Sequence, residues 1–142
     1  FCQRMWTVRS GKTLLNDKPV SVSRTSRLDR SSIGLFWTAD SGFFLSNAEK
    51  TLKNLKATCT NPLSVAYLGG LIASGRMEAV IFPWKHIWEI APMQLIVEGA
   101  GGRATDICGN PLLYGPDNKV EGFIVSNGLL HDRLVELVAS QQ

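Results

Sequence analysis

Apolar residues recur along the chain at two periods, one typical of strands and one typical of helices. Alternating or wholly apolar runs predict strands at Met5–Arg9, Val20–Ser23, Ile33–Thr38, Ala57–Thr60, Glu78–Phe82, Arg103–Ile107 and Phe123–Ser126. A turn at Gly11 or at Asn16-Asp17 is expected to join the first two runs. Because helical segments separate most of these runs, the pattern predicts one α/β layer structure.

Two of the helical segments carry signals for their ends. Ser46 and Glu49 form a capping-box pattern, which predicts a helix that begins at Ser46 and runs to about Lys56. Asn61-Pro62 is typical of an N-cap followed by proline at the first helical position, and Gly75 would end that helix.

Two later helices are predicted from their apolar faces. Ile87, Ile90, Ala91 and Leu95 share one helical face, although Pro92 is expected to kink that helix or to delay its start. The turn Gly99–Gly102 would end it and reverse the chain. Asn127 would cap a final helix, whose apolar stripe is Leu130, Leu134, Leu137 and Val138.

Composition narrows the class of protein and its partners. The 142 residues fit one domain, and 44% hydrophobic with 19% charged residues is typical of a globular chain. No apolar run approaches the roughly 20 residues of a membrane span, so we expect no membrane partner. The net charge is only +3, and no aromatic residues interleave with Arg24, Arg27 and Arg30. We therefore expect no nucleic-acid binding.

The cysteines indicate the compartment. Cys2, Cys59 and Cys108 are odd in number and far apart, and none belongs to a C-x-x-C pair. This pattern favours free thiols in a reducing compartment over disulfides or a zinc site. We expect a cytoplasmic protein.

The segment Trp88–Gly102 reads WEIAPMQLIVEGAGG and places a carboxylate in the first turn of a helix that ends in a Gly-rich turn. It resembles the inositol monophosphatase family, whose hallmark is W-D-x-A, then an apolar helix, then E-A-G-G. Glu89 stands in place of the Asp, and Gly99–Gly102 in place of E-A-G-G. The segments MWTVRSGK, LIASGRMEAVIFPWKHIWE and GFIVSNGLLHDRLVELV are also similar to family segments.

The resemblance implies a fold and an activity. The fold would be the C-terminal α/β half of the family's αβαβα sandwich, a mixed sheet flanked by helices, as one domain over residues 1–142. The activity would be Mg²⁺-dependent hydrolysis of a small phosphomonoester, such as a sugar, polyol or histidinol phosphate. V-E-G-A-G-G is similar to the histidinol-phosphatase branch.

One family motif is missing from the sequence. The D-P-x-D-G-T motif, whose acids hold Mg²⁺ in the family, does not occur in the chain. We therefore expect the N-terminal metal-site half to be absent and Mg²⁺ binding to be weak or absent in the isolated chain. The alternative is a catalytically inactive, truncated family member that acts as a binding or oligomerisation module.

The resemblance also implies site residues, although none has a certain catalytic role. Glu89 would be a metal ligand, because Mg²⁺ in phosphatase sites is held by carboxylates. The alternative is an acid placed in the first helical turn by the helix dipole. Ser64 and Val65 would bind substrate at a helix N-terminus, although Leu63 replaces the family's glycine. The alternative there is a simple Asn-Pro helix start.

Two further substrate-binding positions come from the same comparison. Phe82 stands where several family members carry a Glu that binds a substrate hydroxyl, a contact that Phe cannot make. His86 precedes x-W-E, where the family often has His before x-W-D. The alternative for His86 is a partly buried, hydrogen-bonded side chain.

A half-fold would also leave an apolar face in water. The residues expected on that face are Ile33, Leu35, Trp37, Phe43 and Phe44. A large exposed apolar patch is typical of an interface. We therefore expect a homo-oligomer, namely a homodimer, or the missing N-terminal half to cover it. The small-molecule partner would be a phosphorylated metabolite.

Overall fold

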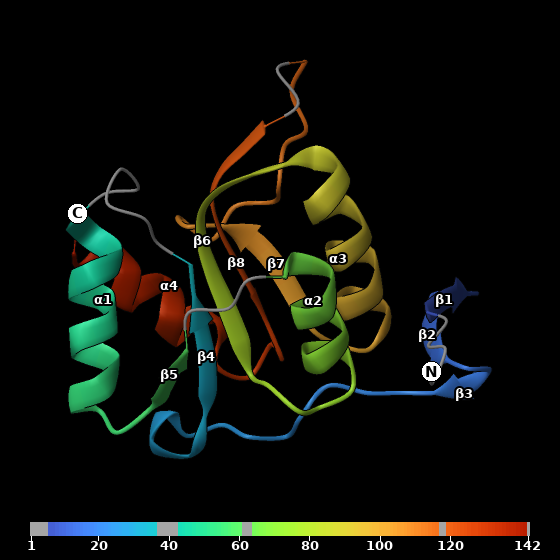
Figure 1. Ribbon diagram of the computed structural model, residues 1–142, viewed down its shortest axis with the longest axis horizontal. Helices are drawn as coiled ribbons and strands as arrows, with labels where there is room; N and C mark the ends of the chain where they lie inside the picture. The colour runs from blue at the N-terminus through green and yellow to red at the C-terminus, as the bar shows by residue number, and fades with distance from the viewer. Residues whose placement is uncertain (1–5, 37–42, 61–63, 117–118, 142) are drawn as a thin grey trace.

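A five-stranded mixed sheet forms the centre of the protein (Figure 1). The computed structural model describes residues 6–36, 43–60, 64–116 and 119–141, with the backbone alone for residues 43–45. The sheet has the order β5-β4-β6-β8-β7, made of β4 (Ser32–Leu35), β5 (Thr58–Thr60), β6 (Ala79–His86), β7 (Arg103–Asp106) and β8 (Lys119–Ser126). β4 is parallel to β5 and β6, whereas β8 is antiparallel to β6 and β7.

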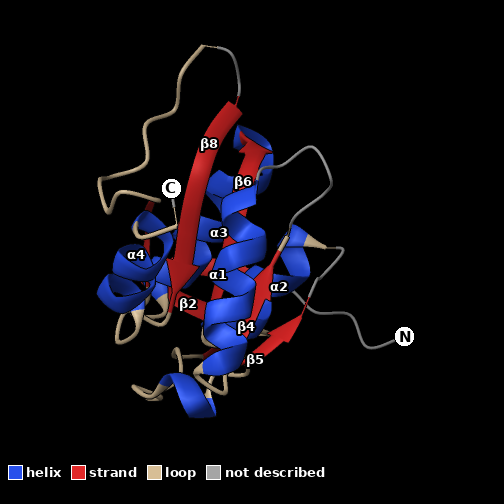
Figure 2. Cartoon of the chain, turned by 90° about the vertical axis from the view of Figure 1, so that its left-hand side faces the viewer, coloured by secondary structure: helices blue, strands red, loops and turns tan. Residues whose placement is uncertain are grey.

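Helices cover both faces of this sheet (Figures 1 and 2). One face packs against α1 (Phe43–Asn54) and α4 (His131–Ala139), and the other against α2 (Val65–Ala73) and α3 (Ile87–Gly99). Because side chains alternate along a strand, Ile81 joins the α1/α4 core while Val80 and Phe82 join the α2/α3 core. The expected α/β class, a mixed sheet flanked by helices, is confirmed.

A separate three-stranded sheet lies beyond α3, on the side away from the central sheet (Figure 1). Its antiparallel strands are β1 (Trp6–Arg9), β2 (Lys12–Leu15) and β3 (Lys18–Pro19). Both turns have two residues with positive φ, Ser10-Gly11 and Asn16-Asp17, as type I′ hairpin turns require. We call this sheet the meander. The chain then continues through a 3₁₀ turn, η1 (Leu28–Arg30), into β4.

The strand predictions near the N-terminus were partly wrong. Val20–Ser23 is not a strand. One turn was predicted, at Gly11 or at Asn16-Asp17, but the structure has a turn at both places, so the second and third strands lie before Val20. β6 is also longer than predicted and continues through Pro83 to His86. β4 ends at Leu35, and the expected extension to Thr38 runs outside the described residues.

Helix starts were also predicted imperfectly. α1 begins at Phe43, so Ser46 lies inside the helix and does not cap it. Burial of Ala48 and Leu52 against the sheet stabilises α1, and such packing outweighs a local capping pattern. α2 has Ser64 as its N-cap and so begins later than predicted; Asn61-Pro62 lies outside the described residues. Pro92 lies inside α3 and does not delay its start at Ile87.

The prediction of an exposed apolar face was wrong for those of its residues that the structure describes. Ile33 is 0% exposed and Leu35 is 1% exposed, because both lie beneath α1 and α4. Trp37 lies outside the described residues, as do the side chains of Phe43 and Phe44.

The predicted C-terminal helix stripe is confirmed, since Leu130, Leu134, Leu137 and Val138 are all buried. Asn127 lies before the helix, and its Oδ1 accepts a hydrogen bond from the Leu130 N–H at 3.2 Å. Among the described residues, no helix has the length and apolar character to cross a bilayer.

Candidate functional site

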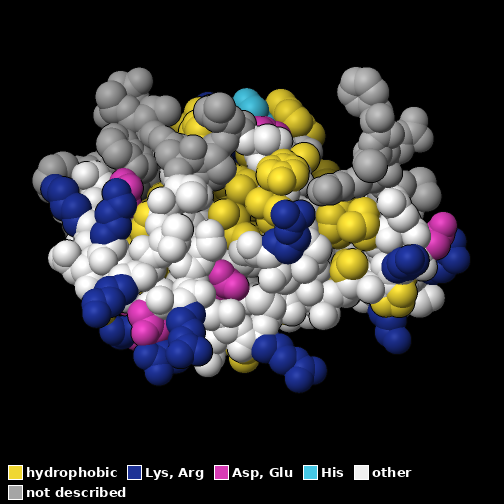
Figure 3. Space-filling view, turned by 60° about the horizontal axis from the view of Figure 1, so that its bottom comes forward, with side chains coloured by type: hydrophobic (Ala, Val, Ile, Leu, Met, Phe, Trp, Pro, Cys, Tyr) yellow, Lys and Arg dark blue, Asp and Glu magenta, His cyan; other side chains and the backbone are white. Residues whose placement is uncertain are grey.

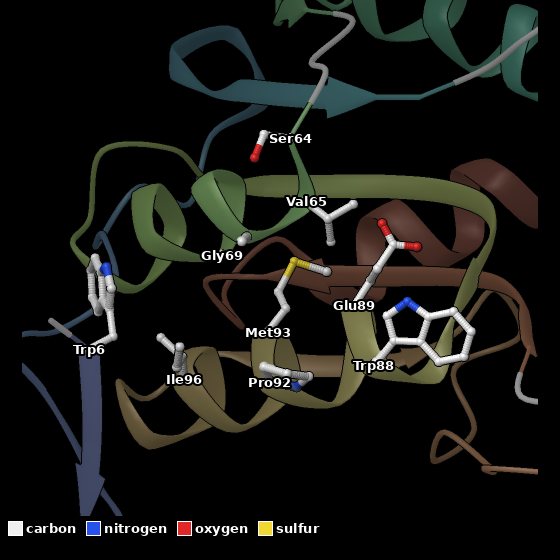
Figure 4. Close-up of a pocket in the computed structure, with 10 residues that line it drawn as sticks. Trp6, Ser64, Val65, Gly69, Trp88, Glu89, Pro92, Met93 and Ile96 are labelled. Carbon is white, nitrogen blue, oxygen red and sulfur yellow. The ribbon is translucent and has the colours of Figure 1, made fainter. Parts of the chain in front are cut away.

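A cavity of about 410 Å³ lies between α2 and α3 (Figure 4). Both helices and β1 contribute to its wall, which is formed by Trp6, Ser64, Val65, Ala66, Gly69, Trp88, Glu89, Pro92, Met93 and Ile96. The wall is mainly apolar, and its polar side-chain groups are the Ser64 hydroxyl, the Glu89 carboxylate and the indole N–H groups of Trp6 and Trp88. A concave apolar site with a few polar groups is the usual form of a small-molecule site.

The N-terminus of α2 forms one end of this cavity. Ser64 is the N-cap, with an extended backbone at φ −127° and ψ 112°, and Val65 is the first helical residue. The first N–H groups of a helix have no partner within it and carry a partial positive charge. This end of the cavity is therefore suited to an anion.

Glu89 faces the same space from α3, and its carboxylate points between the two helices (Figure 4). It lies in the first turn of α3, where its Oε2 accepts a hydrogen bond from the backbone N–H of His86 at 3.4 Å. The side chain is 31% exposed. The carboxylate thus stabilises the helix start and still remains accessible to a ligand.

Lys85 is a site residue that sequence reasoning missed. Its Nζ lies 3.9 Å from Glu89 Oε1 and 4.3 Å from the centre of the Phe36 ring, and its side chain is 15% exposed. Lys85 and Glu89 are four residues apart, but they lie in β6 and α3, so the helical i, i+4 rule does not apply and no local signal marks the pair. A fixed ammonium beside Glu89 balances the carboxylate charge in the absence of another cation.

Sequence reasoning also missed Gly69 and Gly70. A Gly-Gly pair inside a helical pattern indicates that another segment packs closely against that part of the helix. A Cβ on Gly69 would lie 2.7 Å from Met93 Cγ, so this glycine lets α2 and α3 come close. A Cβ on Gly70 would lie 2.8 Å from Trp6 Cζ2. The two glycines therefore set the depth of the cavity and seat β1 at its end.

The structure brings together three of the five residues predicted from sequence, Glu89, Ser64 and Val65. Phe82 lies elsewhere: its ring is 1% exposed and stacks on Phe123 at 5.1 Å between centroids. Its burial in the α2/α3 core does not support a contact with substrate.

His86 does not line the cavity either. Its ring stacks on Trp88 at 4.3 Å between centroids and meets the edge of Trp84 at 5.6 Å. It is half-buried and orients Trp88, which does line the cavity.

The described residues do not make a magnesium site on their own. Mg²⁺ prefers six oxygen ligands in near-octahedral geometry. Within the described ranges, no group of three or more His, Cys, Asp or Glu side chains could hold a metal ion. Glu89 offers one carboxylate, and Lys85 lies beside it. At this cavity the described residues supply one acidic ligand and one anion-binding helix end, and any further ligands must come from outside them.

Relatives and solved structures resemble large parts of this chain. A Thermotoga maritima fructose-1,6-bisphosphatase/inositol-1-monophosphatase is 34% identical over 98 residues, which cover 68% of this chain and 35% of that protein. A Streptomyces griseus protein named glucose-1-phosphate thymidylyltransferase is 31% identical over 139 residues, covering 91% of this chain and 51% of that protein. The chain thus spans about half, or less, of the length of these curated relatives.

The fold of this chain also matches about half of a solved structure. The Thermotoga maritima IMPase superposes with a TM-score of 0.82 and 23% identity, over 97% of this chain and 52% of that chain. The model of the inositol monophosphatase family matches residues 1–142, which is the whole sequence. With this match, the chain belongs to the inositol monophosphatase family.

Proposed function

We propose that this chain forms one wall of a Mg²⁺-dependent phosphomonoesterase site. The supporting observation is that Glu89 and the N-terminus of α2 meet at one cavity. A phosphate group suits the helix N-terminus, and a cation suits the carboxylate. A metal-bound phosphate satisfies both.

In this proposal Glu89 supplies one carboxylate ligand, while Ser64 and Val65 at the start of α2 hold the phosphate. Bound Mg²⁺ would polarise the phosphate ester and activate water for attack on phosphorus. Lys85 remains beside Glu89 and limits the excess negative charge when the metal is absent. The remaining acidic ligands come from outside the described residues.

The substrate we propose is a small phosphorylated metabolite, such as a sugar, polyol or histidinol phosphate. The apolar wall at Pro92, Met93 and Ile96 favours the carbon skeleton of the substrate over a second charged group. Trp88 at the rim is 63% exposed and offers a flat face to a sugar or imidazole ring.

The test is phosphate release from sugar, inositol and histidinol phosphates, with and without Mg²⁺. It uses the chain alone and the chain co-expressed with the part of the Thermotoga maritima IMPase that it does not match. Glu89→Gln should lower kcat/KM by about 100-fold or more, because it removes a ligand charge at the reacting centre. Glu98→Gln is the matched control, since Glu98 is an exposed carboxylate on the same helix.

If Glu89→Gln and Glu98→Gln have equal effects on turnover, Glu89 is not a metal ligand. If turnover is absent in both preparations, a second candidate gains support, namely a non-catalytic binding or oligomerisation module. The ion pair between Lys85 and Glu89 favours that candidate, because it already neutralises the single acid of the cavity.

A further inference from the structure

A second hollow lies outside the cavity, at the loop that precedes β4. Its volume is about 350 Å³, and it is lined by Arg24, Thr25, Ser26, Arg27 and Arg30. We call it the arginine hollow. Its loop leads into the start of β4, which is parallel to β6, whereas Glu89 follows the end of β6. The eight residues of β6 span about 25 Å at roughly 3.3 Å per residue, so the hollow and the cavity lie at opposite ends of the central sheet (Figure 1).

The arginine hollow carries more positive charge than the protein balances. Arg27 donates from Nε and Nη2 to the two carboxylate oxygens of Asp29, at 2.9 and 2.7 Å, and this pair is neutral as a unit. Arg24 and Arg30 make no ion pair in the described part of the chain. Figure 3 turns this end toward the viewer and shows basic side chains gathered at its lower left. The two unpaired guanidinium groups, which stay protonated, leave a charge of about +2 for a ligand to balance.

The backbone of the loop is fixed by hydrogen bonds at both of its ends. Asn127 is 2% exposed and donates from Nδ2 to the Thr25 carbonyl at 2.8 Å and to Ser23 Oγ at 2.9 Å. At the other end, the Ser31 hydroxyl donates to the Leu28 carbonyl at 2.7 Å and closes the η1 turn. A loop held in this way loses little further entropy when it binds a ligand.

The side-chain donors of the hollow suit a phosphate group. Among the described residues, the hydroxyls of Thr25 and Ser26 have no hydrogen-bond partner. A guanidinium presents a planar fork of N–H groups that fits two phosphate oxygens, and a hydroxyl can donate to a third. A phosphomonoester carries a charge of about −1.5 to −2 at pH 7, which matches the unbalanced charge of Arg24 and Arg30. A monovalent anion would leave one of these guanidinium groups without a counter-charge.

An apolar hollow adjoins the arginine hollow and shares Ser26 and Arg27 with it. Its volume is about 360 Å³, and the rest of its wall is formed by Leu28, Asp29, Leu55, Leu129, Leu130 and Arg133. Leu129 is 58% exposed and Leu55 is 39% exposed. Apolar surface beside a group of polar donors suits a ligand that has both an anionic group and a carbon skeleton. The two hollows together therefore favour an organic phosphate over inorganic phosphate.

We propose that the arginine hollow binds the phosphate group of a small organic phosphomonoester, whose organic group lies over the neighbouring leucines. Arg24 and Arg30 balance the phosphate dianion, and the hydroxyls beside them donate hydrogen bonds to it. Among the described residues that line the two hollows, the one acid is Asp29, which is already paired with Arg27. With no free carboxylate or imidazole to activate water, the site binds this ligand without hydrolysing it.

The test is an NMR titration of the ¹⁵N-labelled chain with phenyl phosphate, in buffer that contains EDTA so that no metal-dependent hydrolysis occurs. We expect the backbone amides of Thr25–Arg30 to shift with a Kd of about 1 mM or tighter. Methyl phosphate has the same charged group but little apolar surface, so it should bind at least about threefold more weakly. Shifts at Ser64 and Val65 would belong to the cavity, so they report on the proposed function separately.

Arg24→Gln and Arg30→Gln are the discriminating variants. Both side chains are exposed, so each variant should keep its fold and its circular dichroism spectrum. Each removes one of the two unbalanced charges and should weaken binding of phenyl phosphate by at least about fivefold. Lys18→Gln is the matched control, because Lys18 is an exposed cation on β3, outside both hollows. That change should alter the Kd by less than about twofold, since salt screens distant charges.

Three results would overturn the proposal. The first is the absence of shifts at Thr25–Arg30 with phenyl phosphate at about 10 mM, tenfold above the expected Kd. The second is equal weakening by Arg24→Gln and Lys18→Gln, because binding would then follow net charge alone. The third is equal affinity for phenyl phosphate and methyl phosphate, because the leucines would then have no part in binding.

Discussion

At the scale of single residues, His131 lies outside the cavity, is 0% exposed and has a hydrogen-bond partner at each ring nitrogen. Ser126 Oγ accepts from the Gly128 N–H and lies 2.8 Å from His131 Nδ1. Thr105 Oγ1 donates to the Asp106 carbonyl and lies 2.8 Å from His131 Nε2. Each hydroxyl has one proton, so His131 accepts at Nδ1 and donates from Nε2. The network therefore fits the neutral ring in one tautomer.

The same surroundings oppose a charged ring. Burial, together with the nearby positive charge of Arg103, lowers the pKa of His131 from an ordinary value of 6.5 to about 4. An imidazolium would donate from both nitrogens, so the Ser126 hydroxyl would have to turn its proton away from Nδ1 before it could accept that hydrogen bond. His131 thus belongs to the folded state as a neutral group.

This arrangement predicts acid sensitivity of the folded state. Between pH 6.5 and 4 the unfolded chain binds a proton at His131 that the folded chain does not, so the free energy of unfolding falls as pH falls through this range. A shift of about 2.5 units corresponds to at most about 3 kcal/mol. The measurement is urea unfolding from pH 7.5 to 4.5, in which the difference in slope between the native chain and His131→Gln isolates this proton. Equal slopes would contradict the assignment.

At the scale of elements, the sequence pattern located the strands of the central sheet and the apolar stripe of the last helix, although β6 and β8 are each longer than predicted. The errors in helix and strand boundaries occur where a local sequence signal is outweighed by packing against the sheet. Ser46 looked like an N-cap, yet Ala48 and Leu52 hold a longer α1 against the sheet.

The candidate site was only half predictable for a related reason. Glu89 and Ser64 could be identified from local helix signals, since both lie at helix starts. Lys85 and Trp6 line or flank the cavity only because β6 is extended beyond Phe82 and β1 lies across α3. Such contacts between distant segments have no signature within one segment.

The Gly-rich turn after α3 does more than reverse the chain. A Cβ on Gly102 would lie 2.5 Å from the carbonyl oxygen of Ser126 and 2.5 Å from Val97 Cγ1. The carbonyl belongs to the β8 backbone and has little freedom to move. Gly102 therefore sets the distance between the start of β7 and its neighbouring strand.

We predict that Gly102→Ala destabilises the fold by about 2 to 3 kcal/mol through this overlap. Gly11→Ala is the comparison, because Gly11 has φ +72° but no atom within 4 Å of an added Cβ. That change should cost only the backbone strain, about 1 kcal/mol. Urea unfolding of both variants measures the two values, and an equal loss would show that close packing at Gly102 is not the cause.

At the scale of the whole molecule, the described residues form two parts that we expect to differ in stability. One is the central sheet with its helices, and the other is the meander. The central sheet is covered on both faces, and Ile81, Ile124 and Val80 are fully buried. The meander is held by local hairpins and by a few contacts, such as the 2.6 Å hydrogen bond from Thr13 Oγ1 to the Ile96 carbonyl. The described part of the chain therefore has one body that is stabilised by its own two cores, and one sheet whose stability depends on that body.

This division predicts two levels of hydrogen exchange in the free chain. Amides of β6 and β8 should exchange only through global unfolding, and those of β2 through a smaller opening that detaches the meander. The opening free energy of β2 should be lower by about 2 kcal/mol or more, with a weaker dependence on urea. Equal opening free energies and urea dependences for β2 and β8 would contradict two levels of stability.

Among the described strands β1 pairs with β2 alone, so one edge of β1 is open, and that edge affects how the protein associates with other chains. A free strand edge beside an apolar face is a template for any extended chain, and natural proteins usually protect such edges with charge or proline. On β1 that protection rests on Arg9, since Trp6, Thr7 and Val8 are uncharged. Arg9 is therefore the residue of β1 that opposes edge-to-edge pairing with another extended chain.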